Sequence, residues 1–315
     1  MAVSPRLLTW SLALLGAAAA VAQTPLPPSG TTASTLVVDG VEREYLLHVP
    51  PGYDGDERLP LVLFLHGRGG NGAQASRRYG MSRLADQHRF LVAYPSGVDR
   101  QRGWRPDYYR QAERVGGNGS DLPFLTALLD HLTASYAIDR RRVYAAGHSA
   151  GGIMSYALAG ALSDRIAAVG VVAGSIGLRQ PDGARLTVRE PEHPVAVIAF
   201  HGQRDPIIGY DEEHGRHAAY KFFVSAPDSA AFFAAHGGCE KTPKTEQLFD
   251  GKIVHETWSG GRNGTSVELY TLVDGGHSWP FASRGRGLSA SERIWEFFAA
   301  HVKPEAEKEE AGRKR

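Results

Sequence analysis

The chain has 315 residues, of which 42% are hydrophobic and 22% charged, as expected of a globular protein with a full core. Its 35 basic and 34 acidic residues leave a formal net charge of +1. Because this balance creates no strong electrostatic field, the composition argues against nucleic acid as a partner.

The N-terminal segment has the pattern of an export signal. Residues 1–6 carry one positive charge, residues 7–19 are almost entirely apolar, and small residues precede Gln23. We predict a signal peptide over residues 1–22, cleaved after Ala22, which makes the mature protein secreted or periplasmic. A membrane anchor is the alternative, but the apolar run is shorter than the roughly 20 residues that span a bilayer, and no later run is long enough.

Residues 23–34 are rich in Pro, Thr and Ser and are predicted to be a linker. Two runs of strand-forming residues, 35–38 and 41–49, flank Asp39-Gly40, which predicts an antiparallel hairpin. Strands are then predicted at 59–65, 90–94, 142–146, 166–172, 195–200 and 267–273, and helices at 73–87, 122–136, 151–162 and 290–302. Asp121 is placed to cap the second helix, and Ser289 with Glu292 forms a capping box for the last one.

This order predicts one α/β domain over residues 35–302, with a mostly parallel central sheet, an N-terminal antiparallel hairpin and helices on both faces. Residues 202–225 are irregular and polar, and are expected to form a loop or small cap over a site. The charged residues 303–315 are predicted to be a disordered tail. Cys239 is the sole cysteine, so no intrachain disulfide can form, and we interpret it as a packed or free thiol.

The stretch Gly147-His148-Ser149-Ala150-Gly151 matches the G-x-S-x-G pattern of a nucleophile elbow. A glycine-rich turn without reactivity has the same letters. The predicted strand before the stretch and the predicted helix after it favour the elbow, which presents the serine hydroxyl above a sheet. We therefore predict Ser149 as a nucleophile that needs a neighbouring base to take its proton.

Among 13 histidines, His277 is the candidate base, because it follows the predicted strand 267–273 at the sheet edge where ligands gather. His66 is expected to brace a turn, and His148 to point away from the serine. His214 and His217 lie in a charged segment and are expected to be solvated. The histidines do not form a zinc-binding pattern, so no metal is expected.

The candidate acid is Asp205, which follows the predicted strand 195–200. Asp211 is the second choice, and Asp274 lies too close to His277 in sequence. The order serine, acid, histidine is that of α/β-hydrolases. Backbone N–H groups of Ala150 and Arg68 are the predicted oxyanion donors, because one follows the nucleophile and the other lies in the glycine-rich loop after strand 59–65.

Several stretches together resemble one known family: YLLHVPPGY, LPLVLFLHGRGGNG, IDRRRVYAAGHSAGG, HGQRDPIIGY and DGGHSWP. They are similar to the secreted poly(3-hydroxybutyrate) depolymerase-like, feruloyl and acetyl xylan esterases of carbohydrate esterase family one, over about residues 35–300. The resemblance implies an α/β-hydrolase fold, no cofactor and a two-step serine esterase mechanism. It places nucleophile, acid and base on Ser149, Asp205 and His277.

The chain departs from the family pattern in DLPFLTALLD, in Phe281 after Trp279-Pro280, and in its single cysteine. Trp104 and Trp279 are candidate aromatic walls for a feruloyl or sugar ring, with core packing as the alternative. We recognise no appended substrate-binding domain, which favours ester groups on plant polysaccharide or soluble oligomers over solid polyester. The alternatives are a poly(3-hydroxybutyrate) depolymerase or hydroxyalkanoate oligomer hydrolase, a serine peptidase of the same fold, and a non-catalytic exported binding protein. The oligomeric state stays open.

Overall fold

The computed structural model describes residues 29–97, 103–107, 120–180, 182–211, 213–214, 218, 222–282 and 287–305. The predicted signal peptide lies outside these ranges, as do residues 23–28 of the predicted linker, His217, and residues 306–315 of the predicted tail. In the described part of the chain, no helix combines the length and the apolar character that a membrane crossing requires.

The N-terminal hairpin forms as predicted, but it begins earlier than expected. Strands β1 (Gly30–Val38) and β2 (Val41–Val49) pair antiparallel along their whole length. Asp39 and Gly40 form the turn with φ angles of 51° and 76°, the left-handed conformation that a two-residue hairpin turn needs. Residues 30–34 of the predicted linker are therefore strand, and the folded domain starts before residue 35.

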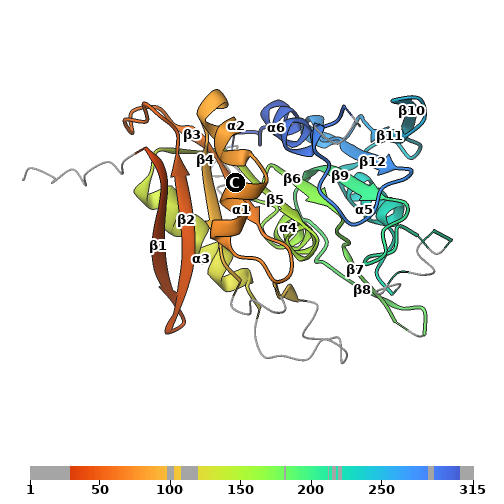
Figure 1. The fold of residues 1–315 in the computed structure, drawn as a ribbon, viewed down its shortest axis with the longest axis horizontal. Helices are drawn as coiled ribbons and strands as arrows, with labels where there is room; N and C mark the ends of the chain where they lie inside the picture. The colour runs from red at the N-terminus through yellow and green to blue at the C-terminus, as the bar shows by residue number, and fades with distance from the viewer. Residues whose placement is uncertain are drawn as a thin grey trace, which may run out of the picture.

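A ten-stranded sheet forms the centre of the molecule, in the order β1-β2-β4-β3-β5-β6-β9-β12-β11-β10 (Figure 1). Its six central strands run parallel, and the pairs at the two edges are antiparallel. The mostly parallel α/β fold predicted from the sequence is confirmed. Beyond the hairpin, the strands are β3 (Leu59–Leu65), β4 (Leu91–Pro95), β5 (Ile138–His148), β6 (Ala168–Val172), β9 (Ala196–Gly202), β10 (Lys244–Leu248), β11 (Ile253–Trp258) and β12 (Val267–Leu272).

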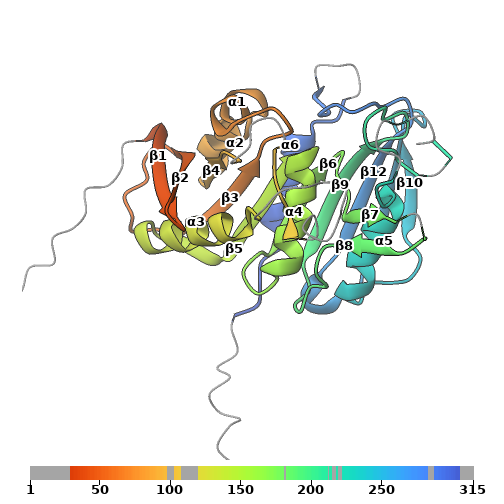
Figure 2. The same cartoon turned by 90° about the horizontal axis from the view of Figure 1, so that it is seen from below.

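Helices cover both faces of this sheet, as predicted (Figure 2). One face packs against α1 (Gly72–Arg78), α2 (Met81–His88) and α6 (Ala290–Ala300), and the other against α3 (Leu122–Ser135), α4 (Ala150–Ala161) and α5 (Ala226–Gly237). Strand β3 shows why two layers are needed. Its residues are all buried, and alternate side chains enter the two separate hydrophobic clusters.

Two local predictions are wrong. The helix expected over residues 73–87 is two helices, because Gly80 adopts a left-handed φ of 74° and starts α2 in a new direction. Asp121 occupies the N-cap position before α3, but its side chain makes no capping hydrogen bond. Its carboxylate instead accepts hydrogen bonds from Arg43, at 2.6 Å, and from the Arg105 N–H, at 2.9 Å. Ser289 does cap α6, by accepting from the Glu292 N–H.

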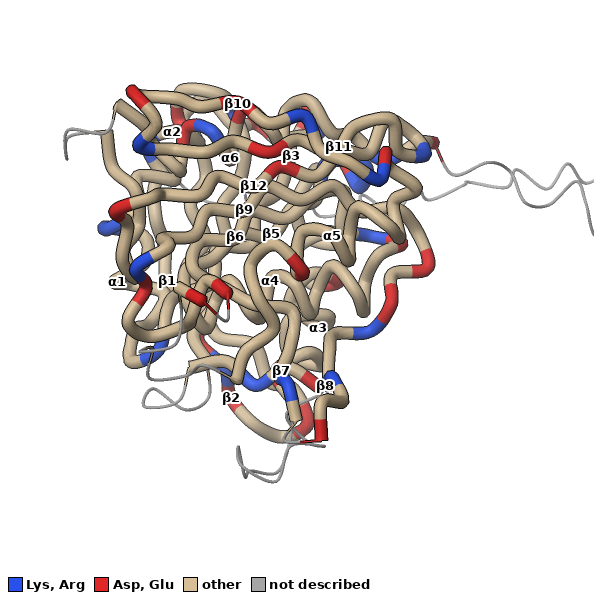
Figure 3. The backbone as a smooth tube through the Cα atoms, turned by 90° about the vertical axis from the view of Figure 1, so that its right-hand side faces the viewer, with Lys and Arg blue, Asp and Glu red and all other residues tan. Residues whose placement is uncertain are grey.

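Several elements of the structure have no counterpart among those predicted from the sequence. They are the edge strands β10 and β11, helix α5, and a small second sheet of β7 (Gly177–Arg179) and β8 (Arg185–Thr187). In the view of Figure 3, basic and acidic residues are interspersed along the described backbone.

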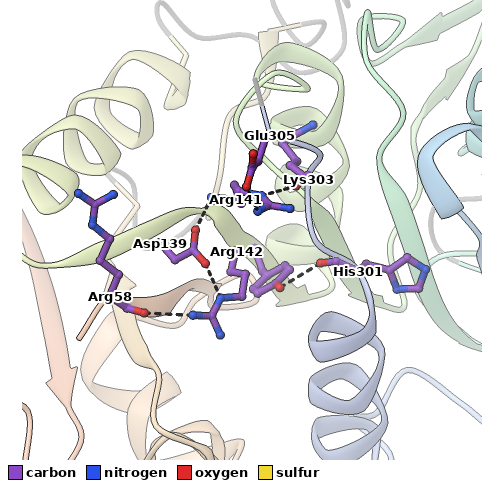
Figure 4. A network of polar contacts seen from close by, with 8 residues as sticks. Arg58, Asp139, Arg141, Arg142, His301, Lys303 and Glu305 are labelled. Atoms are coloured by element: carbon purple, nitrogen blue, oxygen red, sulfur yellow. Dashed lines mark hydrogen bonds and ion pairs between the residues drawn. The ribbon is translucent and has the colours of Figure 1, made fainter. Parts of the chain in front are cut away.

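The described C-terminal residues are held against β5, so the predicted disordered tail does not begin at Lys303. The Lys303 N–H donates to the Arg141 carbonyl at 3.0 Å, and Arg141 Nε donates to the Lys303 carbonyl at 2.7 Å. Arg141 also pairs with Glu305 at 3.2 Å, while Asp139 binds Arg142 at 2.6 Å (Figure 4). The folded domain therefore extends at least to Glu305.

Candidate active site

Ser149 lies in a sharp turn between β5 and α4. Its φ and ψ are 57° and −118°, a conformation that is strained for any residue other than glycine. The turn is held by two backbone hydrogen bonds, from Ser149 N–H to the Val172 carbonyl and from Ile153 N–H to the Ser149 carbonyl, at 2.8 and 3.0 Å. This strand–turn–helix geometry is that of a nucleophile elbow.

The two glycines of the motif are required by close packing. A Cβ atom on Gly147 would overlap the backbone of Gly151, and one on Gly151 would overlap the carbonyl of Leu65, the last residue of β3. The motif therefore lets the end of β5, the start of α4 and the end of β3 approach one another closely at Ser149.

Ser149, His277 and Asp205 form one continuous line of hydrogen bonds. Ser149 Oγ lies 2.8 Å from His277 Nε2, and His277 Nδ1 lies 2.7 Å from Asp205 Oδ2. The three residues follow the parallel strands β5, β12 and β9, so the sheet brings together positions that are 128 and 72 residues apart in sequence. The structure thus assembles the three residues that the sequence singled out.

The Asp205 carboxylate is fully buried and accepts several hydrogen bonds. Oδ1 accepts from the backbone N–H groups of Ile207 and Ile208 at 2.8 and 3.0 Å, and His201 Nε2 lies 3.4 Å from Oδ2. Burial by itself raises the pKa of the carboxyl, but hydrogen bonds and charge from His201 and His277 outweigh it and hold the pKa well below its usual range. Asp205 is therefore ionised and positioned to orient His277.

The other two candidate acids are engaged elsewhere. Asp211 binds His214 at 2.9 Å, and Asp274 pairs with Arg204 at 2.8 Å. Neither contacts His277 in the described structure, so the geometry favours Asp205. His214 is exposed, as the sequence predicted.

His148 is half-buried beside the triad but does not bind Ser149. Its Nδ1 lies 3.3 Å from the Tyr79 hydroxyl, and its ring centroid lies 5.3 Å from that of His277. Burial, together with the nearby His277 and Arg78, lowers the pKa of His148 to about 3, so the imidazole is neutral. A neutral ring at this position fills space beside His277 without adding a charge.

His66 braces the loop after β3, as expected from the sequence. Its Nδ1 and the Gly67 carbonyl are 2.8 Å apart, and Nε2 accepts from the Gly97 N–H at 3.0 Å. Since Nε2 accepts, the proton of the neutral ring sits on Nδ1 and donates to Gly67. Burial lowers the pKa of His66 and favours this neutral form.

The two predicted oxyanion donors lie next to each other. Both lie against Gly103: a Cβ atom placed on this glycine would be 3.1 Å from the Ala150 Cβ and 3.6 Å from the Arg68 nitrogen. Gly67, next to Arg68, is equally close to the nucleophile, since a Cβ atom placed on it would be 3.7 Å from the Ser149 Cβ. Ala150 opens α4, where backbone N–H groups have no acceptor within the helix. The arrangement can therefore direct two N–H groups at an oxygen bound near Ser149.

A cavity of about 680 Å³ opens over Ser149 and His277. Its lining includes Ser149, His277, His148, Arg68, Arg77, Arg78, Gln74, Tyr79 and Ile207. A second cavity, of about 690 Å³, lies at the opposite ends of the strands beside the last turn of α6, and none of the triad residues lines it. The first cavity is therefore the one that can present a substrate to Ser149.

The prediction that Trp104 and Trp279 form walls of the substrate site is wrong. Each is 1% exposed, and neither lines the cavity. Trp104 Nε1 donates to the His66 carbonyl at 2.8 Å, and Trp279 Nε1 donates to Ser291 Oγ at 3.1 Å. Both indoles are packed behind the site, where they support loops that carry functional groups.

The cavity wall itself was missed by the sequence analysis. Arg77, Arg78 and Tyr79 belong to the end of α1, and Ile207 follows Asp205 on the loop after β9. Only the position of Ile207, two residues after the candidate acid, offered a sequence signal. The α1 residues approach Ser149 through the fold alone.

No group of three or more His, Cys, Asp or Glu side chains that could hold a metal ion occurs among the residues that the structure describes. Cys239 is a half-buried free thiol whose Sγ lies 3.6 Å from the Thr265 carbonyl. Burial raises its pKa, which keeps the thiol protonated and unreactive, as the sequence led us to expect.

Comparison with known proteins identifies similar sequences and folds. The family model described as esterase PHB depolymerase matches residues 43–182. A putative esterase, NocK, from Nocardia uniformis subsp. tsuyamanensis is 30% identical over 290 residues, which cover 87% of this chain and 82% of the relative. Feruloyl esterase C from Emericella nidulans is 30% identical over 265 residues, covering 82% and 84% of the two chains.

Among solved structures, an acetyl xylan esterase from Aspergillus awamori superimposes with a TM-score of 0.59 at 16% identity, covering 85% of this chain and 99% of that one. At this level of identity the likeness concerns the fold alone, and that fold is the α/β-hydrolase fold.

Proposed function

The chain belongs to the esterase family of feruloyl esterase C and the PHB depolymerase-like enzymes, and on that basis we propose that it hydrolyses carboxylic esters through Ser149, His277 and Asp205. The observation that carries the proposal is the hydrogen-bonded line from Ser149 Oγ through His277 to the buried Asp205 carboxylate. The 2.8 Å contact suits proton transfer from serine to histidine, and the 2.7 Å contact orients the imidazole for it.

In the proposed mechanism, His277 Nε2 takes the proton of Ser149 Oγ as this oxygen attacks the ester carbonyl carbon. The carbonyl oxygen becomes an oxyanion, which accepts hydrogen bonds from the Ala150 and Arg68 N–H groups. The imidazolium, stabilised by Asp205, then protonates the leaving alcohol oxygen, and an acyl-enzyme remains on Ser149. Water activated by His277 cleaves the acyl-enzyme, which releases the acid and restores the serine.

For the substrate, we propose ester groups on plant polysaccharide, of the feruloyl or acetyl type. The name of feruloyl esterase C, which is similar to this chain over most of its length, supports this choice. A hydroxyalkanoate polyester or oligomer is the second candidate, favoured by the match of residues 43–182 to the PHB depolymerase esterase model. The complete set of serine, histidine and acid argues against a non-catalytic binding protein.

We propose that the protein acts after export, because residues 1–22 have the charge and apolar pattern of a signal peptide and small residues precede Gln23. This places the enzyme in the periplasm or outside the cell, where polymer-linked esters are accessible.

A comparison of substrates tests the proposal. The chain from residue 23 onward is assayed on methyl ferulate, acetylated xylan, hydroxybutyrate oligomers and a peptide amide, with the Ser149→Ala variant beside it. We expect hydrolysis of at least one ester, and a fall in kcat of about 10⁶ in the variant, as when the nucleophile of a serine hydrolase is removed. Esterase activity that survives in Ser149→Ala would refute the mechanism, and cleavage of the peptide amide alone would refute the esterase class.

A further inference from the structure

Two arginines at the end of α1 give the active-site cavity a positive wall. Arg77 and Arg78 form the last turn of the helix, both are exposed, and both line the cavity that contains Ser149 and His277. Among the residues that the structure describes, no aspartate or glutamate lines this cavity. Within the described ranges, neither arginine forms an ion pair, and both line the cavity that an incoming anion would enter.

Arginines at a helix C-terminus often only complement the helix dipole. Here a second observation places the charge at the reacting centre. The Arg78 guanidinium carbon lies 5.8 Å from the centroid of the Tyr79 ring, whose hydroxyl contacts His148. The same guanidinium helps to lower the pKa of His148, so its field reaches the imidazole that packs against His277.

The contacts also indicate which part of the ester the arginines face. The leaving alcohol oxygen must lie beside His277 Nε2, because His277 protonates it. From His277 the neighbouring side chains run to His148, then to Tyr79, and then to Arg78. This row of contacts puts Arg78 on the His277 side of the cavity, which is the side to which the alcohol leaves, whereas Ala150 and the Arg68 nitrogen lie close to Gly103.

We propose that the esters cleaved by this enzyme carry a carboxylate on their alcohol part, held by Arg77 and Arg78. This inference rests on the proposed function and specifies its substrate class. Guanidinium groups bind carboxylates through paired, charge-assisted hydrogen bonds, and two adjacent arginines suit such an anion. Two kinds of ester have this chemistry: a hydroxyalkanoate oligomer with a free carboxyl end, and an acylated polysaccharide unit that contains a uronic acid.

Matched ester pairs test the proposal. One pair is 3-acetoxybutyrate and its neutral amide, which represent the hydroxyalkanoate oligomer. The other pair is an acetylated methyl glucuronoside and its neutral amide, which represent the polysaccharide unit that contains a uronic acid. We compare the wild type with Arg77→Gln, Arg78→Gln, the double variant, and Arg83→Gln as a control. Arg83 lies on the neighbouring helix α2, pairs with Glu292 and does not line the cavity, so its loss removes the same charge elsewhere.

We expect the double variant to raise KM for the anionic member of at least one pair by about tenfold, and to leave KM for the amide within about twofold. Added salt should raise KM for the anion only, because ions screen the attraction of exposed charges. The Arg83→Gln control should match the wild type. A pair built on the acyl side, monoethyl succinate and ethyl succinamate, should show no such dependence on the two arginines.

The inference is overturned if the double variant changes KM equally for both members of every alcohol-side pair, or changes KM for neither member. If the wild type still hydrolyses the neutral esters in that case, the proposed function stands. The inference is also overturned if the arginines discriminate only the acyl-side pair. If the wild type hydrolyses no ester, the proposed function fails. In that case, calorimetry measures the binding of the two alcohol-side anions to Ser149→Ala and to the same variant with Arg77 and Arg78 replaced by glutamine. Binding that disappears when the arginines are replaced supports the inference. Binding that is unchanged by their replacement, or absent from both proteins, refutes it.

Discussion

Replacing Asp205 with asparagine should disable the enzyme while leaving its fold intact. Asp205 Oδ1 accepts from the N–H groups of Ile207 and Ile208, and Oδ2 accepts from His277 Nδ1 at 2.7 Å. An asparagine can keep the two backbone bonds only through its single oxygen, so its amide NH₂ faces His277. Nδ1 must then accept a hydrogen bond, the ring proton moves to Nε2, and His277 can no longer take the proton of Ser149.

The expected loss in kcat is about 10⁴-fold, the size found when the triad acid of a serine protease becomes an amide with unchanged geometry. This corresponds to about 5.5 kcal/mol of transition-state stabilisation, at 1.36 kcal/mol for each factor of ten. Initial rates on a soluble ester, with concentrations spanning KM, measure kcat and KM separately. Near-ultraviolet circular dichroism and a thermal melt establish that the variant is folded.

The matched control is Asp211→Asn, which changes the second candidate acid. Asp211 binds only His214 among the contacts described for it, so this variant should keep kcat within about twofold. The reasoning is refuted if a folded Asp205→Asn protein retains more than a tenth of the wild-type kcat. It is equally refuted if Asp211→Asn loses activity to the same extent.

Three further predictions concern stability and support of the site. Because the pKa of Asp205 is lowered in the folded protein, its ionised form stabilises the fold above the ordinary pKa of 3.8, and this contribution is lost as pH falls below 3.8. The difference in unfolding free energy between wild type and Asp205→Asn should therefore become smaller from pH 6 to pH 3 in urea titrations. A difference that stays constant would contradict this linkage. Asp121→Ala leaves the buried Arg43 without its ion-pair partner and should lower the free energy of unfolding by about 3–5 kcal/mol in denaturant titrations. Glu57→Ala, in the exposed Arg89–Glu57 pair, should lower it by less than about 1 kcal/mol, and equal losses would refute the argument from burial. Trp104→Phe removes the hydrogen-bond donor to the His66 carbonyl and should lower the free energy of unfolding by about 1 kcal/mol. It should also lower kcat several-fold with little change in KM, because the loop after β3, which carries Arg68, loses a support. An unchanged kcat would show that this loop does not need the Trp104 hydrogen bond.

The catalytic residues were predictable because chemistry restricts both their types and their places. A serine hydrolase needs a nucleophile, a base and an acid, and a parallel sheet delivers all three at the ends of buried strands. Those strands are short apolar runs such as Leu59–Leu65, which is buried at every position and easily recognised. The order of Ser149, Asp205 and His277 then followed from where the runs end.

Elements whose existence depends on distant contacts were not predictable. Residues 73–87 have helical composition apart from Gly80, and a glycine within such a stretch does not by itself show whether the helix continues, as one helix, or ends there, as it does between α1 and α2. The Asp121 carboxylate looks like a helix cap in sequence, but Arg43 lies 78 residues away and takes it instead. Strand β10 is polar and largely exposed, so it lacks the apolar pattern that identifies a strand.

The two tryptophans show that closeness in sequence does not determine side-chain direction. His277 and Trp279 are two residues apart, yet His277 binds Ser149 while the Trp279 indole donates to Ser291 on α6. Trp104 likewise lies near the site but faces inward, toward the His66 carbonyl. Each direction depends on a partner from another element, which a single sequence does not reveal.

The cavity wall differs from the triad in the same respect. Arg77, Arg78 and Tyr79 face the reacting centre because α1 stops beside it, and α1 stops there because Gly80 turns the chain in a left-handed conformation. A helix that continued through this point would carry later residues past the cavity. Catalytic chemistry is thus encoded in motifs, which few residue types can satisfy, whereas the charge offered to a substrate depends on where one short helix ends.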